Sequence, residues 1–132
     1  MTLRDLRNNV SPAHSLEPAV RPTGTYTGTG VDLQGYHSAL LLVHFGAYTN
    51  GTHTPTLEHS DDNASYATVG AAELDGSLSA VSAGGGANSV QLVGYKGSKR
   101  YVRAVMTVAS GATGAASAAT IVRGTPVTMP TA

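Results

Sequence analysis

Five histidines and eight acidic residues are the side chains of this 132-residue chain that could bind a metal ion or carry out acid–base chemistry. No two histidines show the H-x-x-x-H or H-E-x-x-H spacing that presents two ligands to one zinc ion. The chain has no cysteine, so it can form neither a thiolate metal site nor a disulfide. We therefore expect no bound metal and no cofactor. The histidines are His14, His37, His44, His53 and His59.

An acidic stretch near residue 60 carries the oxygen ligands that calcium prefers. Asp61 and Asp62 are adjacent, and Glu58 precedes them. Asn63 could add a carbonyl oxygen. Calcium loops of the EF-hand type space their ligands as D-x-D-x-D-G, and this stretch does not. We interpret it as a solvated turn.

Neither nucleophilic catalysis nor catalysis by paired carboxylates has a recognisable motif here. Ser, His and Asp are all present, but no G-x-S-x-G turn places a serine ahead of a helix. Asp61 and Asp62 lie in a turn rather than facing each other across a cleft. Residues 84–86 are three glycines without a following Lys-Ser/Thr pair, so they do not form a phosphate-binding loop. We expect a protein that is not an enzyme and has no catalytic residues.

Six of the seven aromatic residues are tyrosines, whose rings can bind sugars by stacking. In a β-sandwich they could line such a face, or they could be strand residues whose hydroxyl groups lie at the rim of the core. The sequence leaves both interpretations open. The tyrosines are Tyr26, Tyr36, Tyr48, Tyr66, Tyr95 and Tyr101.

Half of the eight basic residues occur within eight positions, at Lys96, Lys99, Arg100 and Arg103. Such a cluster could contact an acidic or polar partner, or it could be a solvated chain reversal. We call these four residues the basic cluster.

The overall composition excludes some classes of partner. Net charge is zero, the sequence pI is about 7.0, and only 12% of residues are charged. This argues against binding to nucleic acid through phosphate neutralisation and against binding to a membrane surface. The first eleven residues do not resemble a signal peptide, and the longest apolar run, residues 39–43, is too short to span a bilayer. We expect a soluble, single-domain protein made in the cytoplasm.

The clearest secondary structure lies in residues 88–110, where two runs rich in Val, Leu and Tyr flank a polar loop at residues 96–99. This pattern predicts a β-hairpin. In its second arm Val102, Ala104, Met106 and Val108 share one face, which suits a core.

Further strands are predicted along the chain from short apolar runs bounded by turn residues. Residues 24–32 predict an irregular edge strand, and residues 38–45 predict a central strand covered on both faces, because both faces are apolar. The Asn50-Gly51 turn precedes a strand at residues 56–60. Residues 77–87 predict a mobile loop. Short strands are also predicted at residues 66–69 and 118–123.

The two ends of the chain differ in character from its middle. Residues 1–23 carry Pro12, Pro18 and Pro22 at a spacing that a helix or central strand does not tolerate, so we expect an extended arm, disordered or laid across a neighbouring subunit. The β domain is then residues 24–125, followed by a tail at residues 126–132. The fold expected is an all-β, jelly-roll-like antiparallel β-sandwich, with a small barrel as the alternative.

Four segments resemble a family of small proteins encoded among the head genes of tailed bacteriophages. They are LRDLRNNVSP, TGTGVDLQGYHSALLLVHFGAYTNGTHTPTLEHSDDNASYATV, VGYKGSKRYVRAVMTV and IVRGTP. The best-understood small β proteins of this kind are capsid cement, or decoration, proteins. The resemblance implies a protein of the virion that binds the exterior of an icosahedral head and joins neighbouring subunits of the major capsid protein. It brings no catalytic residues.

A capsid role leads to expectations about assembly and contacts. A homo-oligomer is expected, a dimer or trimer at a symmetry axis of the capsid. The contacts with shell or sister subunit are assigned to the arm and to the basic cluster. They are Arg4, Arg7, Asn8, Asn9, Lys96, Lys99, Arg100 and Arg103. The alternatives are a carbohydrate-binding β-sandwich domain of the virion and a head–tail connector or tail protein.

Overall fold

The structure is a computed structural model that describes residues 6–126. It is built almost entirely of β-strands joined by loops and three short 3-10 turns. The strands are β1 (Val10–Arg21), β2 (Gly24–Thr27), β3 (Val31–Asp32), β4 (Tyr36–Tyr48), β5 (Thr52–Ser60), β6 (Ala67–Thr68), β7 (Leu74–Asp75), β8 (Val90–Tyr95), β9 (Tyr101–Ala109) and β10 (Ala115–Pro126). The turns are η1 (Arg7–Asn9), η2 (Ala71–Glu73) and η3 (Gly84–Gly86).

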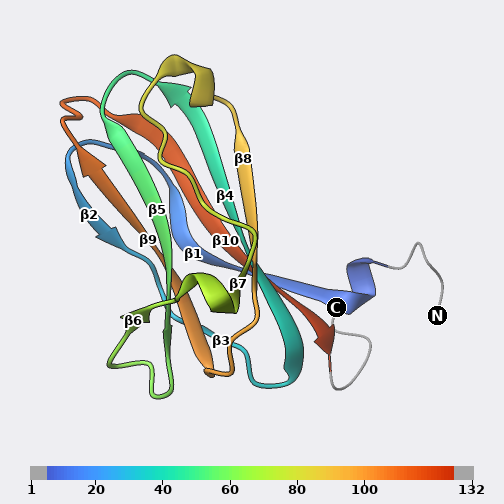
Figure 1. The fold of residues 1–132 in the computed structure, drawn as a ribbon. Coiled ribbons are helices and arrows are strands. Elements are labelled where there is room, and N and C mark those ends of the chain that lie inside the picture. Colours follow the sequence, from blue (N-terminus) through green and yellow to red (C-terminus); the bar gives the residue numbers. More distant parts are fainter. Residues whose placement is uncertain (1–5, 127–132) are drawn as a thin grey trace.

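The strands form two antiparallel sheets packed face to face (Figure 1). Sheet A has the strand order β1-β10-β4-β8-β7, and sheet B has the order β2-β9-β5-β6, with β3 also paired to β9. The prediction of an all-β antiparallel sandwich is confirmed. Within residues 6–126, none of the helical segments has the length and apolar character needed to cross a bilayer.

The core lies between the inner faces of the two sheets. In β9 the predicted core face is confirmed, since Val102 and Met106 are buried; on the other face Thr107 is exposed, whereas Val105 is buried. In β4 the inward residues include Leu41 and Val43, which are fully buried. Small and β-branched side chains fill most of this space, because the sequence has one Phe and no Trp.

The strand predicted at residues 38–45 is found as β4, in the middle of sheet A between β10 and β8. Only one of its faces is covered. Leu40 and Leu42 lie partly exposed on the outer face and His44 is exposed, so the prediction of cover on both sides is wrong. A two-layer sandwich covers each sheet on its inner face only, so apolar residues on the outer face of a central strand stay accessible.

Residues 88–110 do not form a hairpin. β8 pairs with β4 and β7 in sheet A, whereas β9 pairs with β2, β3 and β5 in sheet B. The segment 96–100 therefore crosses from one sheet to the other. The alternation of apolar residues is the same for a hairpin and for such a crossing, so the sequence did not distinguish them.

The N-terminal arm is shorter than predicted. Residues 10–21 form β1, an edge strand that pairs with β10. Pro12 is tolerated because an edge strand has an unpaired side, and Pro18 lies where the register shifts between Leu16 and Ala19. At the other end β10 continues to Pro126, which pairs with Tyr36. Residues 1–5 and 127–132, including Arg4 and most of the predicted tail, lie outside the described residues.

The other predicted strands are found with shifted ends. Residues 24–32 contain the edge strands β2 and β3, and residues 52–60 form β5 after the Asn50-Gly51 turn. β6 and β10 match the strands predicted at residues 66–69 and 118–123. The predicted mobile loop, residues 77–87, is anchored: Val81 is buried and bonded through its backbone to His53.

The β4–β5 and β9–β10 connections pack closely together at one end of the sandwich. The side-chain oxygen of Asn50 accepts hydrogen bonds from the backbone N–H groups of Thr113 and Gly114. Gly114 has a φ of +89°, and a Cβ at this position would collide with the backbone carbonyl of Arg21. Glycine is therefore required here both for its conformation and for its lack of a side chain.

Replacing Gly114 by Ala should lower the free energy of unfolding by about 3 kcal/mol or more, because the methyl group adds a steric clash to an unfavourable φ. Gly35 provides the matched control, since its φ is +93° but a Cβ added there would meet no atom within 4 Å. Gly35→Ala should cost only about 1–2 kcal/mol. Urea unfolding of both variants measures the difference, and equal losses would show that the contact with Arg21 is not limiting.

Candidate interaction surfaces

The basic cluster is largely neutralised by carboxylates from other elements. The Lys99 Nζ lies 2.7 Å from an oxygen of Asp61. The Arg100 guanidinium donates two hydrogen bonds to Asp32, with N–O distances of 2.9 and 2.8 Å. Lys96 forms no ion pair with any of the described residues. The cluster is thus mainly a set of ion pairs within the chain, rather than a free positive surface.

The third ion pair lies on the outer face of sheet B and is less exposed. Arg103 on β9 pairs with Glu58 on β5, where the two residues are cross-strand neighbours at an N–O distance of 2.7 Å. The Arg103 guanidinium also lies 3.8 Å from the centre of the Tyr66 ring. The carboxylate partners of Lys99, Arg100 and Arg103 lie 38 to 68 positions away in the chain, so the sequence pattern could not reveal these three ion pairs.

Arginine side chains lie over most of the tyrosine rings. Four rings each have a guanidinium within 5.5 Å of the ring centre. Tyr95 is buried, and Tyr48 packs edge-on against His53. A row of bare tyrosine faces, which a sugar-binding surface needs, is not formed by these six rings. The stacked pairs are Tyr26 with Arg21, Tyr36 with Arg123, Tyr66 with Arg103, and Tyr101 with Arg100.

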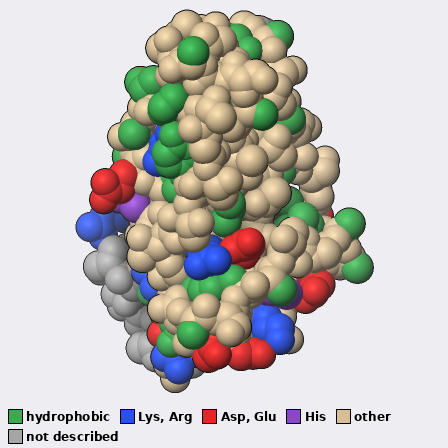
Figure 2. Space-filling model, turned by 90° about the vertical axis from the view of Figure 1, so that its left-hand side faces the viewer, with side chains coloured by type: hydrophobic (Ala, Val, Ile, Leu, Met, Phe, Trp, Pro, Cys, Tyr) green, Lys and Arg blue, Asp and Glu red, His purple; other side chains and the backbone are tan. Residues whose placement is uncertain are grey.

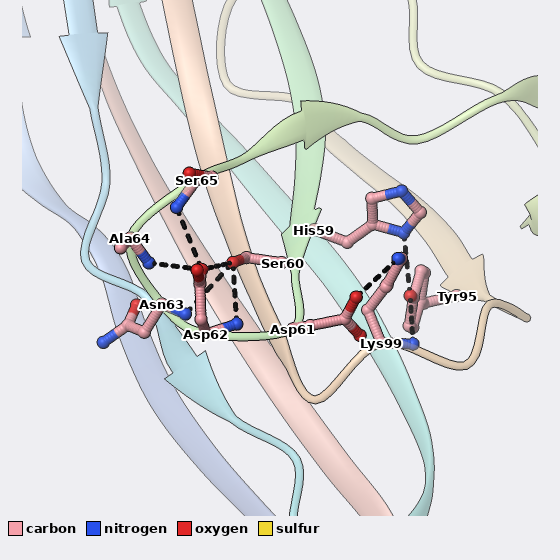
Figure 3. A network of polar contacts seen from close by, with 9 residues as sticks. All are labelled: His59, Ser60, Asp61, Asp62, Asn63, Ala64, Ser65, Tyr95 and Lys99. Atoms are coloured by element: carbon pink, nitrogen blue, oxygen red, sulfur yellow. Dashed lines mark hydrogen bonds and ion pairs between the residues drawn. The ribbon is translucent and has the colours of Figure 1, made fainter.

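The acidic stretch near residue 60 is a turn whose carboxylates already have donors (Figure 3). One oxygen of Asp62 accepts hydrogen bonds from the backbone N–H groups of Ala64 and Ser65 and from the Ser60 hydroxyl. These donors lower the pKa of Asp62 from 3.8 to about 2, with the bond from Ser65 the largest cause. The geometry is that of a side-chain-capped turn.

A buried polar chain lies beside this turn and anchors the crossing between the sheets (Figure 3). The Tyr95 hydroxyl accepts a hydrogen bond from the backbone N–H of Lys99, at 3.0 Å. Its second hydrogen bond joins it to His59 Nδ1, at 2.9 Å. Burial is the main cause that raises the pKa of the Tyr95 hydroxyl. The contact fixes Tyr95 across the core and stabilises the path of residues 96–100.

The histidines do not come together. His53 and His59 are buried in sheet B, whereas His14 and His44 lie exposed on different strands of sheet A. Within residues 6–126, no three His, Asp or Glu side chains are grouped so that they could hold a metal ion.

The predicted N-terminal contacts lie at the end of sheet A. Arg7, Asn8 and Asn9 form η1 directly before β1, and Arg7 is exposed. Figure 1 shows η1 displaced from the body of the sandwich, beyond the end of β1. The basic cluster lies in the crossing and on β9, so the two predicted contact regions belong to different parts of the fold. Arg4 lies outside the described residues.

An apolar area on the outer face of sheet A was not predicted as a site. Cross-strand pairing aligns Leu42 with Leu92, and Leu40 with Val122. Val90 and Leu92 are each 58% exposed. The alternation of β8 could have revealed it, since Val90 and Leu92 occupy the face opposite the buried Val93. We call Leu40, Leu42, Val90, Leu92 and Val122 the sheet A patch.

Charged side chains are unevenly distributed over the molecule. Figure 2 shows one face, on which most of the acidic and basic side chains gather toward the lower end. The stretches 33–57, 76–95 and 104–122 contain no Asp, Glu, Lys or Arg. They supply β4, β8 and most of β10, so the middle of sheet A carries no charge.

This chain resembles a solved structure in its fold, whereas its sequence matches no family model. No protein-family model matches this chain, and no curated protein matches its sequence. Among solved structures, the fold is similar to that of the PBSX exported protein XepA, with a TM-score of 0.57 and 20% sequence identity. The match covers 93% of this chain but only 39% of XepA. At this identity the likeness shows a shared β fold, and the chain spans about two fifths of its neighbour's length.

Asp62 should titrate with a pKa of about 2, well below its ordinary value of 3.8. Because the folded-state pKa is lowered, the resulting stability is fully present above pH 4 and is lost as the pH falls through 2. Ser60→Ala removes one donor and should raise the pKa of Asp62 toward 3.8. Carbon-detected NMR titration of both proteins measures this, and a pKa near 3.8 in the natural chain would contradict the capped-turn geometry.

Proposed function

We propose that this chain is a structural protein of a phage virion, and specifically a cement protein that binds the outer surface of the head. The observation that carries the proposal is a fold match over nearly the whole chain with XepA, a protein of the prophage PBSX. The sequence resemblance to phage head proteins points the same way. The described residues add a sandwich with few charged side chains, six of which are joined in three ion pairs.

A cement protein works by binding one state of a shell more tightly than another. A shell under pressure from packaged DNA ruptures when contacts between subunits fail. A ligand that binds only the expanded lattice stabilises that lattice by mass action. Each contact can be weak, because the same contact is repeated at every equivalent position of the shell.

The arrangement of charged and aromatic groups favours this proposal over the alternative of sugar binding. Rings such as Tyr66 and Tyr101 already have a guanidinium stacked on them, so little bare aromatic surface remains for a pyranose. The polar contacts proposed for the shell are Arg7, Asn8 and Asn9, together with the basic cluster. The ion pairs of Lys99, Arg100 and Arg103 leave Lys96 as the member of that cluster that pairs with no carboxylate of the described residues.

Cosedimentation of the purified protein with expanded heads that lack it tests the function. We expect saturable binding at a stoichiometry on the order of hundreds of copies per particle, since a cement protein occupies every equivalent site. About a ring's worth of copies would instead identify a connector. Absence of binding would refute a role on the head, and a glycan array would then test the sugar-binding alternative.

Deleting residues 2–9 should weaken head binding by roughly fivefold, equivalent to about 1 kcal/mol, if η1 contacts the shell. The deletion must stop before Val10, because residues 10–21 form β1 and their loss would remove an edge of sheet A. The urea midpoint of the truncated protein serves as the control and should stay close to that of the full chain. Unchanged binding would exclude η1 from the contact.

A further inference from the structure

We propose that the sheet A patch is the surface by which this protein seats on the protein lattice of the head, an inference that rests on the proposed function. In this inference the patch is the principal contact, and the basic cluster contributes less. Its occupant is an uncharged, apolar area on the outside of the shell.

The patch is continuous across three strands of sheet A. Leu42 on β4 lies between Thr120 on β10 and Leu92 on β8. The next row along the strands joins Leu40 to Val122. Leucine and valine side chains thus adjoin one another on the open face of the central strands, where each gains free energy if water is removed.

The outer faces of the two sheets differ in polarity. An antiparallel sheet with one wet face normally alternates apolar and polar residues. The outer face of sheet B is mainly polar: Thr107 on β9 is flanked by Thr25 on β2 and Thr54 on β5, and the apolar Val105 in the next row is buried. Sheet A does not follow this rule at β4 and β8, where Leu40, Leu42, Val90 and Leu92 lie on the outer face. The core between the sheets contains Leu41 and Val43, whereas the outward Leu40 and Leu42 are not part of it.

The surface beside the patch is hollowed. A groove of about 400 Å³ runs along the end of sheet A, between the start of β1 and the middle strands. Leu6, Val10, Leu40 and Val122 lie along it, and Leu6 is 70% exposed. The groove extends the patch toward η1, so a partner seated on the patch would also reach the N-terminal contacts of the proposed function.

The area of the patch and the absence of charged residues on it favour a shell surface over a second copy of this chain as the partner. Three strands about 5 Å apart, with outward residues about 7 Å apart along each, give an area on the order of 300 Å². A stable dimer buries about 800 Å² on each partner, so a second copy of this chain would be held too weakly by the patch alone. A lattice provides many equivalent sites and additional contacts at η1. Because β4, β8 and residues 115–122 of β10 contain no Asp, Glu, Lys or Arg, a charged partner surface would be buried there without an ion-pair partner from these residues.

The test compares Leu92→Glu with Thr107→Glu, which places the same charge on the outer face of the other sheet. Both positions are exposed and lie in the middle of a strand. We expect Leu92→Glu to weaken binding to expanded heads at least about tenfold, and Thr107→Glu to bind within about twofold of the natural chain. Equal binding by the natural protein and Leu92→Glu would overturn the patch assignment alone. Absence of binding by the natural protein would overturn the proposed function, and the patch assignment with it.

A second variant guards against loss of folding. Val90→Thr combined with Leu92→Thr places a β-branched residue at both positions while removing the apolar surface, and should also weaken head binding at least about tenfold with an unchanged urea midpoint. Sedimentation of the natural protein at micromolar concentration tests the competing occupant. A stable dimer that Leu92→Glu converts to monomer would assign the patch to a second copy and overturn the lattice assignment.

Discussion

Ser15 joins the two sheets at their shared edge, and much of the fold depends on this link. Its hydroxyl accepts a hydrogen bond from the backbone N–H of Ala104 and donates one to the carbonyl of Thr29. It can do so because β1 shifts register at this point and turns toward sheet B. A Cβ on Gly28 would collide with Ser15 and with the Ala104 carbonyl, so the gap between β2 and β3 is set by this contact. Ser15 therefore connects β1, at the edge of sheet A, to the break between β2 and β3 beside β9 in sheet B.

The sequence predicted the class of fold and most strand positions, because alternation and turn residues are local signals. It failed where the outcome depends on partners distant in the chain. The alternation of residues 100–108 identified the core face of β9 but could not show that β8 joins the other sheet. The charges of Lys99, Arg100 and Arg103 were visible, whereas their carboxylate partners were not. The leucines of β4 were interpreted as core on both faces, although only the number of layers in the finished fold decides which of them are covered.

The surface chemistry follows from how the chain uses its few charges. Arg21, Arg100, Arg103 and Arg123 each bond to other groups of the chain and lie over a tyrosine ring. Planar guanidinium groups suit both roles at once. Little charge is left to guide association from a distance, so binding to any partner should depend only weakly on salt concentration. The apolar outer face of sheet A then contributes more to affinity than to the rate of encounter.

The pairing of β1 with β10 has a consequence for how the protein acquires its structure. Ser11 and Arg123 bond to each other although they are 112 positions apart in the chain. β10 lies between β1 and β4, so sheet A cannot be completed until β10 has left the ribosome. Until then an edge of β4 and its outer leucines are open together, which is the kind of surface that chaperones bind. Topologies of this kind fold in milliseconds to seconds, and production of the protein should therefore be sensitive to temperature and to chaperone supply.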